Sequence, residues 1–211
     1  MKRKIFISIL FVTAVILSLG AAKPNSDEMK RMGIFVSNFT EQGLFEFDVY
    51  EGDGEDGRLM HLGDEVNMTE LIRFGIQHNV INKPKSTVKK CTVRNCPYGD
   101  SVMPAKSVSE SVKKYFDMDI SHQSENGVYP NFHYENGEYH FTRYEWTPER
   151  VIYADVQKVT RKGKVITMSG ELYNHEKKSE RLGTFEAQAK PYKWNNKDTW
   201  AILSLISDWY E

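Results

Sequence analysis

The spacing of hydrophobic and polar residues changes near residue 128. Before this point, two stretches place apolar residues every three to four positions, which is the period of an α-helix. After it, apolar and polar residues alternate, which is the period of a β-strand. Helices followed by a run of strands predict an α+β fold, since an α/β fold would alternate the two.

Two helices are predicted in the first part. One begins at Asn67, where Glu70 stands three residues later as in a capping box. Its apolar positions are Leu71, Ile72, Gly75, Ile76 and Val80. The other begins near Pro104, because proline suits the first helical turn. Its apolar stripe is Val108, Val112, Tyr115 and Phe116.

The second part predicts an antiparallel meander, because short turns such as Asn136-Gly137 separate consecutive strands. The strands are expected at 128–134, 139–146, 150–160, 164–173, 181–192 and 199–208. We expect two helices packed on one curved antiparallel sheet of five to six such strands. This element order resembles the cystatin-like and NTF2-like architectures over residues 67–208, which implies a pocket between helix and sheet but no particular activity.

An additional strand is expected at 44–50, where Phe45, Phe47 and Val49 alternate with acidic residues. The acidic, glycine-rich residues 51–57 that follow are interpreted as an exposed loop. They do not match the ligand spacing of an EF-hand.

The N-terminus has the pattern of a secretory signal peptide at residues 1–22: a basic start, an uncharged apolar run and a small-residue end. The alternative is an uncleaved anchor, since the apolar run is near the minimum length that spans a bilayer. Residues 23–32 are interpreted as a flexible leader, and 33–211 as a single α+β domain. No later segment is apolar enough to span a membrane.

Composition supports a folded chain. The 211 residues are 40% hydrophobic and carry 28 Lys plus Arg against 29 Asp plus Glu. These values exclude a mostly disordered or collagen-like chain and a polytopic membrane protein. A net charge of −1 argues against nucleic acid as a partner.

The two cysteines, Cys91 and Cys96, are separated by four residues. In an oxidising compartment this predicts a local disulfide. The spacing is not that of a C-x-x-C redox centre, and no further zinc ligand lies adjacent in sequence. The basic residues around them favour a solvated loop, with an anion-binding patch as the alternative.

The segment 132–141, F-H-Y-E-N-G-E-Y-H-F, is nearly a palindrome around an Asn-Gly turn. This register places His133 opposite His140 and Glu135 opposite Glu138, on the face away from the aromatic residues. Two opposed imidazoles and a carboxylate offer a site for zinc or another divalent cation. The simpler interpretation is the solvent face of an edge hairpin.

Three carboxylates form a second candidate site: Asp155, Glu171 and Glu186. On the concave face of the sheet they would converge on a pocket and act as acids or bases. We favour the convex, solvent-exposed face, because charged residues are seldom fully buried.

Four segments resemble uncharacterised exported bacterial proteins, a resemblance that implies no activity: 35–41, 73–79, 183–193 and 199–204. No motif of a serine hydrolase, P-loop or zinc protease is present. We therefore expect an exported binding or interaction module, without a cofactor, whose partner is a small ligand or an envelope or extracellular protein. The alternatives are a metal-binding protein that uses the hairpin, and a hydrolase-like enzyme that uses the three carboxylates.

Overall fold

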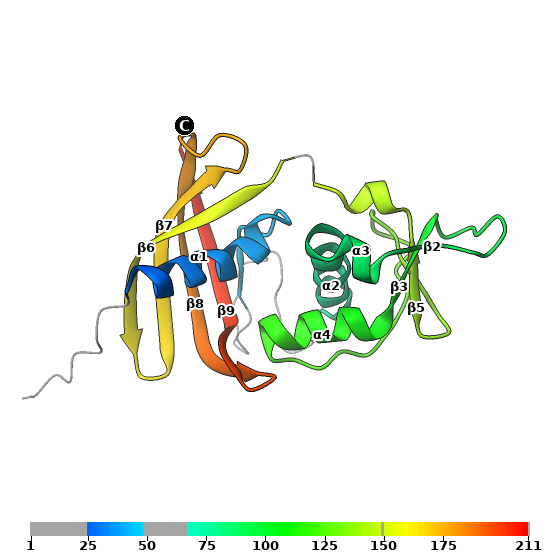
Figure 1. Ribbon diagram of the computed structural model, residues 1–211, viewed down its shortest axis with the longest axis horizontal. Coiled ribbons are helices and arrows are strands. Elements are labelled where there is room, and N and C mark those ends of the chain that lie inside the picture. Colours follow the sequence, from blue (N-terminus) through cyan, green and yellow to red (C-terminus); the bar gives the residue numbers. More distant parts are fainter. Residues whose placement is uncertain (1–24, 49–66, 149, 211) are drawn as a thin grey trace, which may run out of the picture.

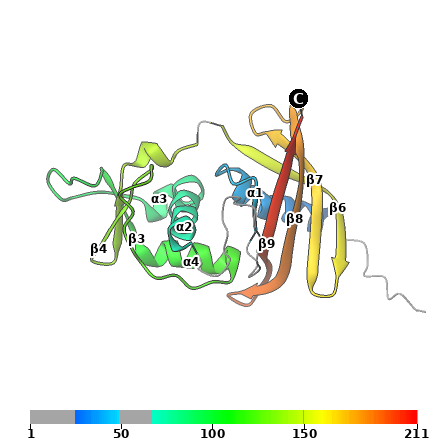
Figure 2. The same cartoon turned by 180° about the vertical axis from the view of Figure 1, so that it is seen from behind.

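The computed structural model describes residues 25–48, 67–148 and 150–210. Two antiparallel sheets stand at opposite ends of the molecule, with the helices α2 (Met68–Asn82) and α4 (Ala105–Phe116) between them (Figure 1). The view from behind shows the same layers (Figure 2). The α+β class is as predicted, but the prediction of one curved sheet is wrong.

The larger sheet contains the predicted meander, in the order β1-β9-β8-β7-β6. Its strands are β1 (Phe47–Asp48), β6 (Ile152–Lys162), β7 (Val165–Asn174), β8 (Arg181–Trp194) and β9 (Lys197–Trp209). The strand expected at 44–50 is represented by β1. Residues 49–50 and the acidic loop at 51–57 lie outside the described residues.

The smaller sheet has the order β2-β3-β5-β4. Its strands are β2 (Lys89–Lys90), β3 (Ser101–Pro104), β4 (His133–Glu135) and β5 (Glu138–Phe141). The two first strands of the expected meander therefore form a hairpin in a different sheet. The reason is the 3-10 helix η1 (Arg143–Trp146), which ends β5 and buries Trp146 in the core beside the smaller sheet.

The helix α1 (Ser26–Thr40) lies across the larger sheet (Figure 1). Residues 26–32 are therefore helical, and their prediction as a flexible leader is wrong. Asn25 caps the helix, its Oδ1 accepting from the Glu28 N–H at 2.8 Å. A stripe of buried side chains faces the sheet: Met32, Phe35, Val36 and Phe39.

The close approach of α1 to β6 depends on Gly33. A Cβ at this position would lie 2.9 Å from the Ala154 carbonyl oxygen. Ser37 fixes the same contact, because its hydroxyl accepts from the Ala154 N–H at 3.0 Å. The N-terminal segment 1–22, interpreted as a signal peptide, lies outside the described residues. Within the described ranges, no helix has the length and hydropathy needed to cross a membrane.

The predicted helices α2 and α4 are confirmed, including the Asn67 cap, whose Oδ1 accepts from the Glu70 N–H at 3.3 Å. A short helix, α3 (Pro84–Thr87), follows α2. On α2, Phe74 packs in the core of the larger sheet and Ile76 in that of the smaller. On α4, Val112 and Val108 divide in the same way. The pair therefore joins the two sheets.

Candidate functional site

The candidate site begins with the loop 91–100, which connects β2 to β3. The Cys91 N–H donates to the Asp100 carbonyl oxygen at 2.8 Å and closes the base of the loop. Asn95 adopts a left-handed backbone with φ of 56°, and the Cys96 N–H donates to the Val93 oxygen at 3.3 Å. These turns bring the two cysteines back toward each other.

The loop packs directly on the end of β5. Gly99 has φ of 131°, and a Cβ there would lie 2.2 Å from the Phe141 carbonyl carbon, so this contact requires glycine. The Asp100 carboxylate accepts from the Arg143 N–H at 3.1 Å and from the Ser101 hydroxyl at 2.9 Å. These hydrogen bonds lower the pKa of Asp100, the one from the Arg143 backbone most.

The hairpin β4–β5 has the predicted register. His133 pairs with His140 and Glu135 with Glu138, across a turn in which Asn136 and Gly137 have φ of 50° and 80°. The predicted solvent face, however, is partly covered. His140 is only 7% exposed, and the Tyr98 ring from the loop stacks on His133 with 3.6 Å between ring centroids.

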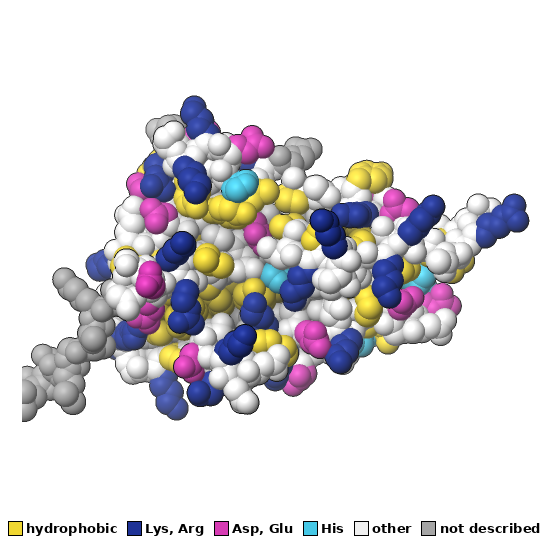
Figure 3. All heavy atoms as spheres, viewed as in Figure 1, with side chains coloured by type: hydrophobic (Ala, Val, Ile, Leu, Met, Phe, Trp, Pro, Cys, Tyr) yellow, Lys and Arg dark blue, Asp and Glu magenta, His cyan; other side chains and the backbone are white. Residues whose placement is uncertain are grey.

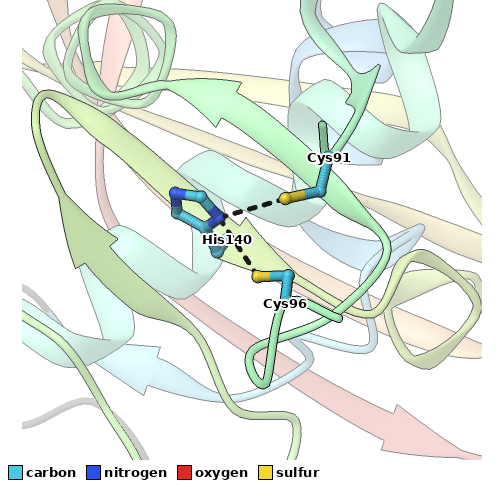
Figure 4. Close-up of side chains that lie close together, drawn as sticks. All are labelled: Cys91, Cys96 and His140. Carbon is cyan, nitrogen blue, oxygen red and sulfur yellow. Dashed lines mark hydrogen bonds between the residues drawn. The ribbon is translucent and has the colours of Figure 1, made fainter. Parts of the chain in front are cut away.

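Three potential ligand atoms meet beneath this loop. Cys91 Sγ and Cys96 Sγ each lie 3.6 Å from His140 Nδ1, and the three atoms lie within 4.8 Å of one another (Figure 4). A sulfur and a nitrogen bound to one tetrahedral zinc ion, at its usual bond lengths, are about 3.6 Å apart. The spacing of each sulfur from the nitrogen therefore fits a shared metal ion.

The predicted disulfide is absent, since both cysteines are half-buried free thiols. Their spacing in sequence could not show that His140, 44 residues beyond Cys96, reaches both sulfurs. Each thiol therefore lies close to the imidazole of His140 as well as to the other thiol.

The predicted hairpin metal set is brought together only in part. His140 belongs to the cluster, whereas His133 does not: its Nδ1 lies 3.2 Å from the Ser124 hydroxyl, and its ring centroid is 6.4 Å from that of His140. Glu135 and Glu138 also lie outside the three-residue group. The sequence indicated both halves of the site, in the cysteines and the hairpin, but gave no sign that they meet.

Burial raises the pKa of the Cys91 thiol, and the neighbouring Cys96 thiol and Glu138 carboxylate raise it further. These influences exceed the opposite effect of a hydrogen bond from the Val93 backbone. The thiol therefore keeps its proton at neutral pH, and a bound metal ion would have to displace it.

The other predicted set, Asp155, Glu171 and Glu186, points away from the core of the larger sheet, and Asp155 also lines a cavity beside α1. The neighbours of these residues along each strand are the buried ones, such as Ala154 and Leu172. Asp155 and Glu171 share Arg181, at 3.3 and 3.4 Å. This supports the solvent-face interpretation.

Comparisons with protein-family models, with curated proteins and with solved structures find no match to this chain. The resemblances to exported bacterial proteins and to the cystatin-like and NTF2-like architectures therefore stay predictions. The function has to be argued from the site.

Proposed function

We propose that this protein is a metal-binding protein that holds one zinc ion on Cys91, Cys96 and His140. One observation carries the proposal: both sulfurs lie at the same 3.6 Å from a single imidazole nitrogen. A neutral imidazole nitrogen accepts one hydrogen bond, so it cannot fully satisfy two thiols. A metal ion among the three atoms would bind all of them.

The donor atoms define the kind of metal. Two sulfurs and one imidazole nitrogen suit zinc and other thiophilic ions, whereas calcium and magnesium prefer oxygen. Three protein ligands leave a fourth position for water or for a group from a partner. In binding, the ion would also tie the loop 91–100 to β5.

We further propose that the protein is exported and acts by binding rather than catalysis. The pattern of residues 1–22 supports export. The ion pairs that Arg181 makes with Asp155 and Glu171 support binding, because they occupy the carboxylates that the hydrolase alternative requires. Coordinated thiolates would also be protected from oxidation to a disulfide.

The test is calorimetric titration of the reduced protein with zinc and with calcium. We expect one zinc to bind per chain, calcium to give no heat, and Cys91→Ser and His140→Ala each to weaken zinc binding at least about tenfold. His133→Ala is the matched control, because His133 pairs directly with His140 but is absent from the cluster. It should bind zinc like the unchanged protein.

Absence of zinc binding to the reduced protein would overturn the proposal. Binding that survives Cys91→Ser but disappears in His133→Ala would favour the hairpin set of His133, His140, Glu135 and Glu138 instead. The absorption spectrum of the cobalt-substituted protein gives a second measure, since thiolate coordination produces charge-transfer bands that a histidine–carboxylate site lacks.

A further inference from the structure

A cavity unrelated to the cysteine–histidine group lies between α1 and β6. Its volume is about 570 Å³, within the range of about 300–1,000 Å³ for small-molecule pockets. Its lining includes the apolar or aromatic residues Met29, Ile34, Tyr153 and Tyr173. Figure 3 shows hydrophobic side chains gathered on this face, where β6 passes α1.

The lining of the cavity also includes a buried carboxylate. Glu41, at the C-terminal end of α1, is only 4% exposed. It accepts one hydrogen bond, from the side-chain amide of Asn82. Asn38 beside it is already engaged, because its amide group donates to the Ile34 carbonyl and its oxygen accepts from the Tyr115 hydroxyl.

The Glu41 carboxylate therefore retains unused acceptor capacity, since a carboxylate offers about four lone-pair sites. Among the described residues, no Lys, Arg or His forms an ion pair with it. Lys30 lines the cavity as well, but it is exposed, so solvent screens its charge. A buried carboxylate without a cation is costly and favours a positively charged ligand.

The apolar and aromatic residues of the lining suit the same kind of ligand. The rings of Tyr153 and Tyr173 stand edge to face, with 6.0 Å between centroids. Aromatic faces attract cations as well as apolar groups. The carboxylate of Glu41 is near enough to Tyr153 to help raise its pKa, although burial is the larger cause. A single small molecule could thus contact both the Glu41 carboxylate and the Tyr153 ring.

We propose that this cavity binds a small organic amine, with its ammonium group on Glu41 and its apolar body against Ile34 and the two tyrosines. The proposal does not depend on the metal site, because no residue is shared between them.

The experiment uses three probes of similar shape, 2-phenylethylamine, 2-phenylethanol and 3-phenylpropionate, titrated into the full chain and followed by NMR chemical shifts. We expect the amine to bind most tightly and to shift the amides of Gly33 and Ala154. Glu41→Gln should weaken amine binding at least about tenfold, because it removes the charge but keeps an acceptor for Asn82. Glu110→Gln, an exposed site on α4 outside the cavity, is the control.

Equal binding of the alcohol or the carboxylate would overturn the proposal, as would undiminished amine binding by Glu41→Gln. Ile34→Lys covers the case in which Glu41→Gln does not fold. Ile34 is 60% exposed, so the fold should tolerate lysine, and the substitution should weaken binding because it removes the apolar contact that Ile34 offers to the body of the amine. Amine binding unchanged in this variant would also contradict the proposal.

Discussion

His78 shows how strongly the position of one residue in the core changes its chemistry. It is 2% exposed, stacked on Phe74 and edge to face with Tyr115. Burial is the main cause that lowers its pKa to about 3, and the positive charges of Lys83 and Lys114 contribute to the same shift. The imidazole is therefore neutral in the folded protein, and its Nδ1 lies 3.2 Å from the Asn82 amide nitrogen.

This neutral histidine should make stability depend on pH. In the unfolded chain, His78 takes up a proton near its ordinary pKa of about 6.5, whereas in the folded chain it does so only near 3. The unfolded state therefore binds more protons between these values, and stability falls as the pH decreases from 6.5 toward 3. The full effect is at most about 5 kcal/mol.

Urea unfolding of the protein and of His78→Gln, at pH 7 and pH 4.5, measures this contribution. We expect the free energy of unfolding to drop less on acidification in the variant, because glutamine does not titrate. Glu41 and the other carboxylates titrate in both proteins, so the comparison isolates His78. An identical acid-induced loss in the two proteins would show that His78 is not the cause.

The residues of the candidate metal site differ in how far the sequence could predict their positions. The pairing of His133 with His140 followed from the Asn-Gly turn, which fixes the register by local geometry. The contact of Cys91 and Cys96 with His140 could not be predicted from the sequence, because it depends on β3 lying beside β5. Only four residues long, β3 has no alternating pattern that marks it in the sequence.

At the scale of elements, long periodic segments were predictable and short or mixed ones were not. The strands β6 to β9 and the helices α2 and α4 have strong periods and were identified. The helix α1 was interpreted as a leader in its first turns, because Asp27, Glu28, Lys30 and Arg31 dominate the sequence there. Those residues belong to one amphipathic helix whose other face, with Met32 and Phe35, is buried.

The loop 91–100 is the element that assembles the candidate metal site, and Gly99 determines how it packs. We expect Gly99→Ala to weaken zinc binding at least about tenfold, because its Cβ would collide with the Phe141 backbone and push the cysteines away from His140. The circular dichroism spectrum should change little, since the loop belongs to neither core cluster. Zinc titration measures the effect.

Gly163→Ala is the matched control. Gly163 also has a positive φ, of 61°, but a Cβ there meets no atom within 4 Å. Alanine there also meets an unfavourable positive φ, in the left-handed region, but causes no collision, and the site lies in the turn between β6 and β7. Equal losses of zinc affinity in the two variants would contradict a specific role for loop packing.

At the scale of the molecule, α2 and α4 bind the two sheets into one unit. Both helices place side chains in both core clusters, so neither cluster is complete without them. The sequence predicted these helices, but it could not show that they lie between two sheets. The apolar residues of the two helices indicate that one face of each is buried, but they do not indicate which element packs on that face.

We therefore expect the two sheets to unfold together. Amides in β5 and in β8 should exchange with solvent with free energies that agree within about 1 kcal/mol, as expected for one cooperative unit. Native-state hydrogen exchange followed by NMR measures both in one sample. A β5 that opens at much lower free energy than β8 would instead show two independently folding parts.

The contact between α1 and β6 has a consequence for the newly made chain. Ser37 and Ala154, which join the two elements, are 117 residues apart in sequence. During synthesis the apolar stripe of α1 emerges long before the strands that cover it. Phe39 can pack early on Phe74 of α2, but the stripe is not fully covered until β6 to β9 have been made, so α1 exposes apolar surface during synthesis and would benefit from a chaperone.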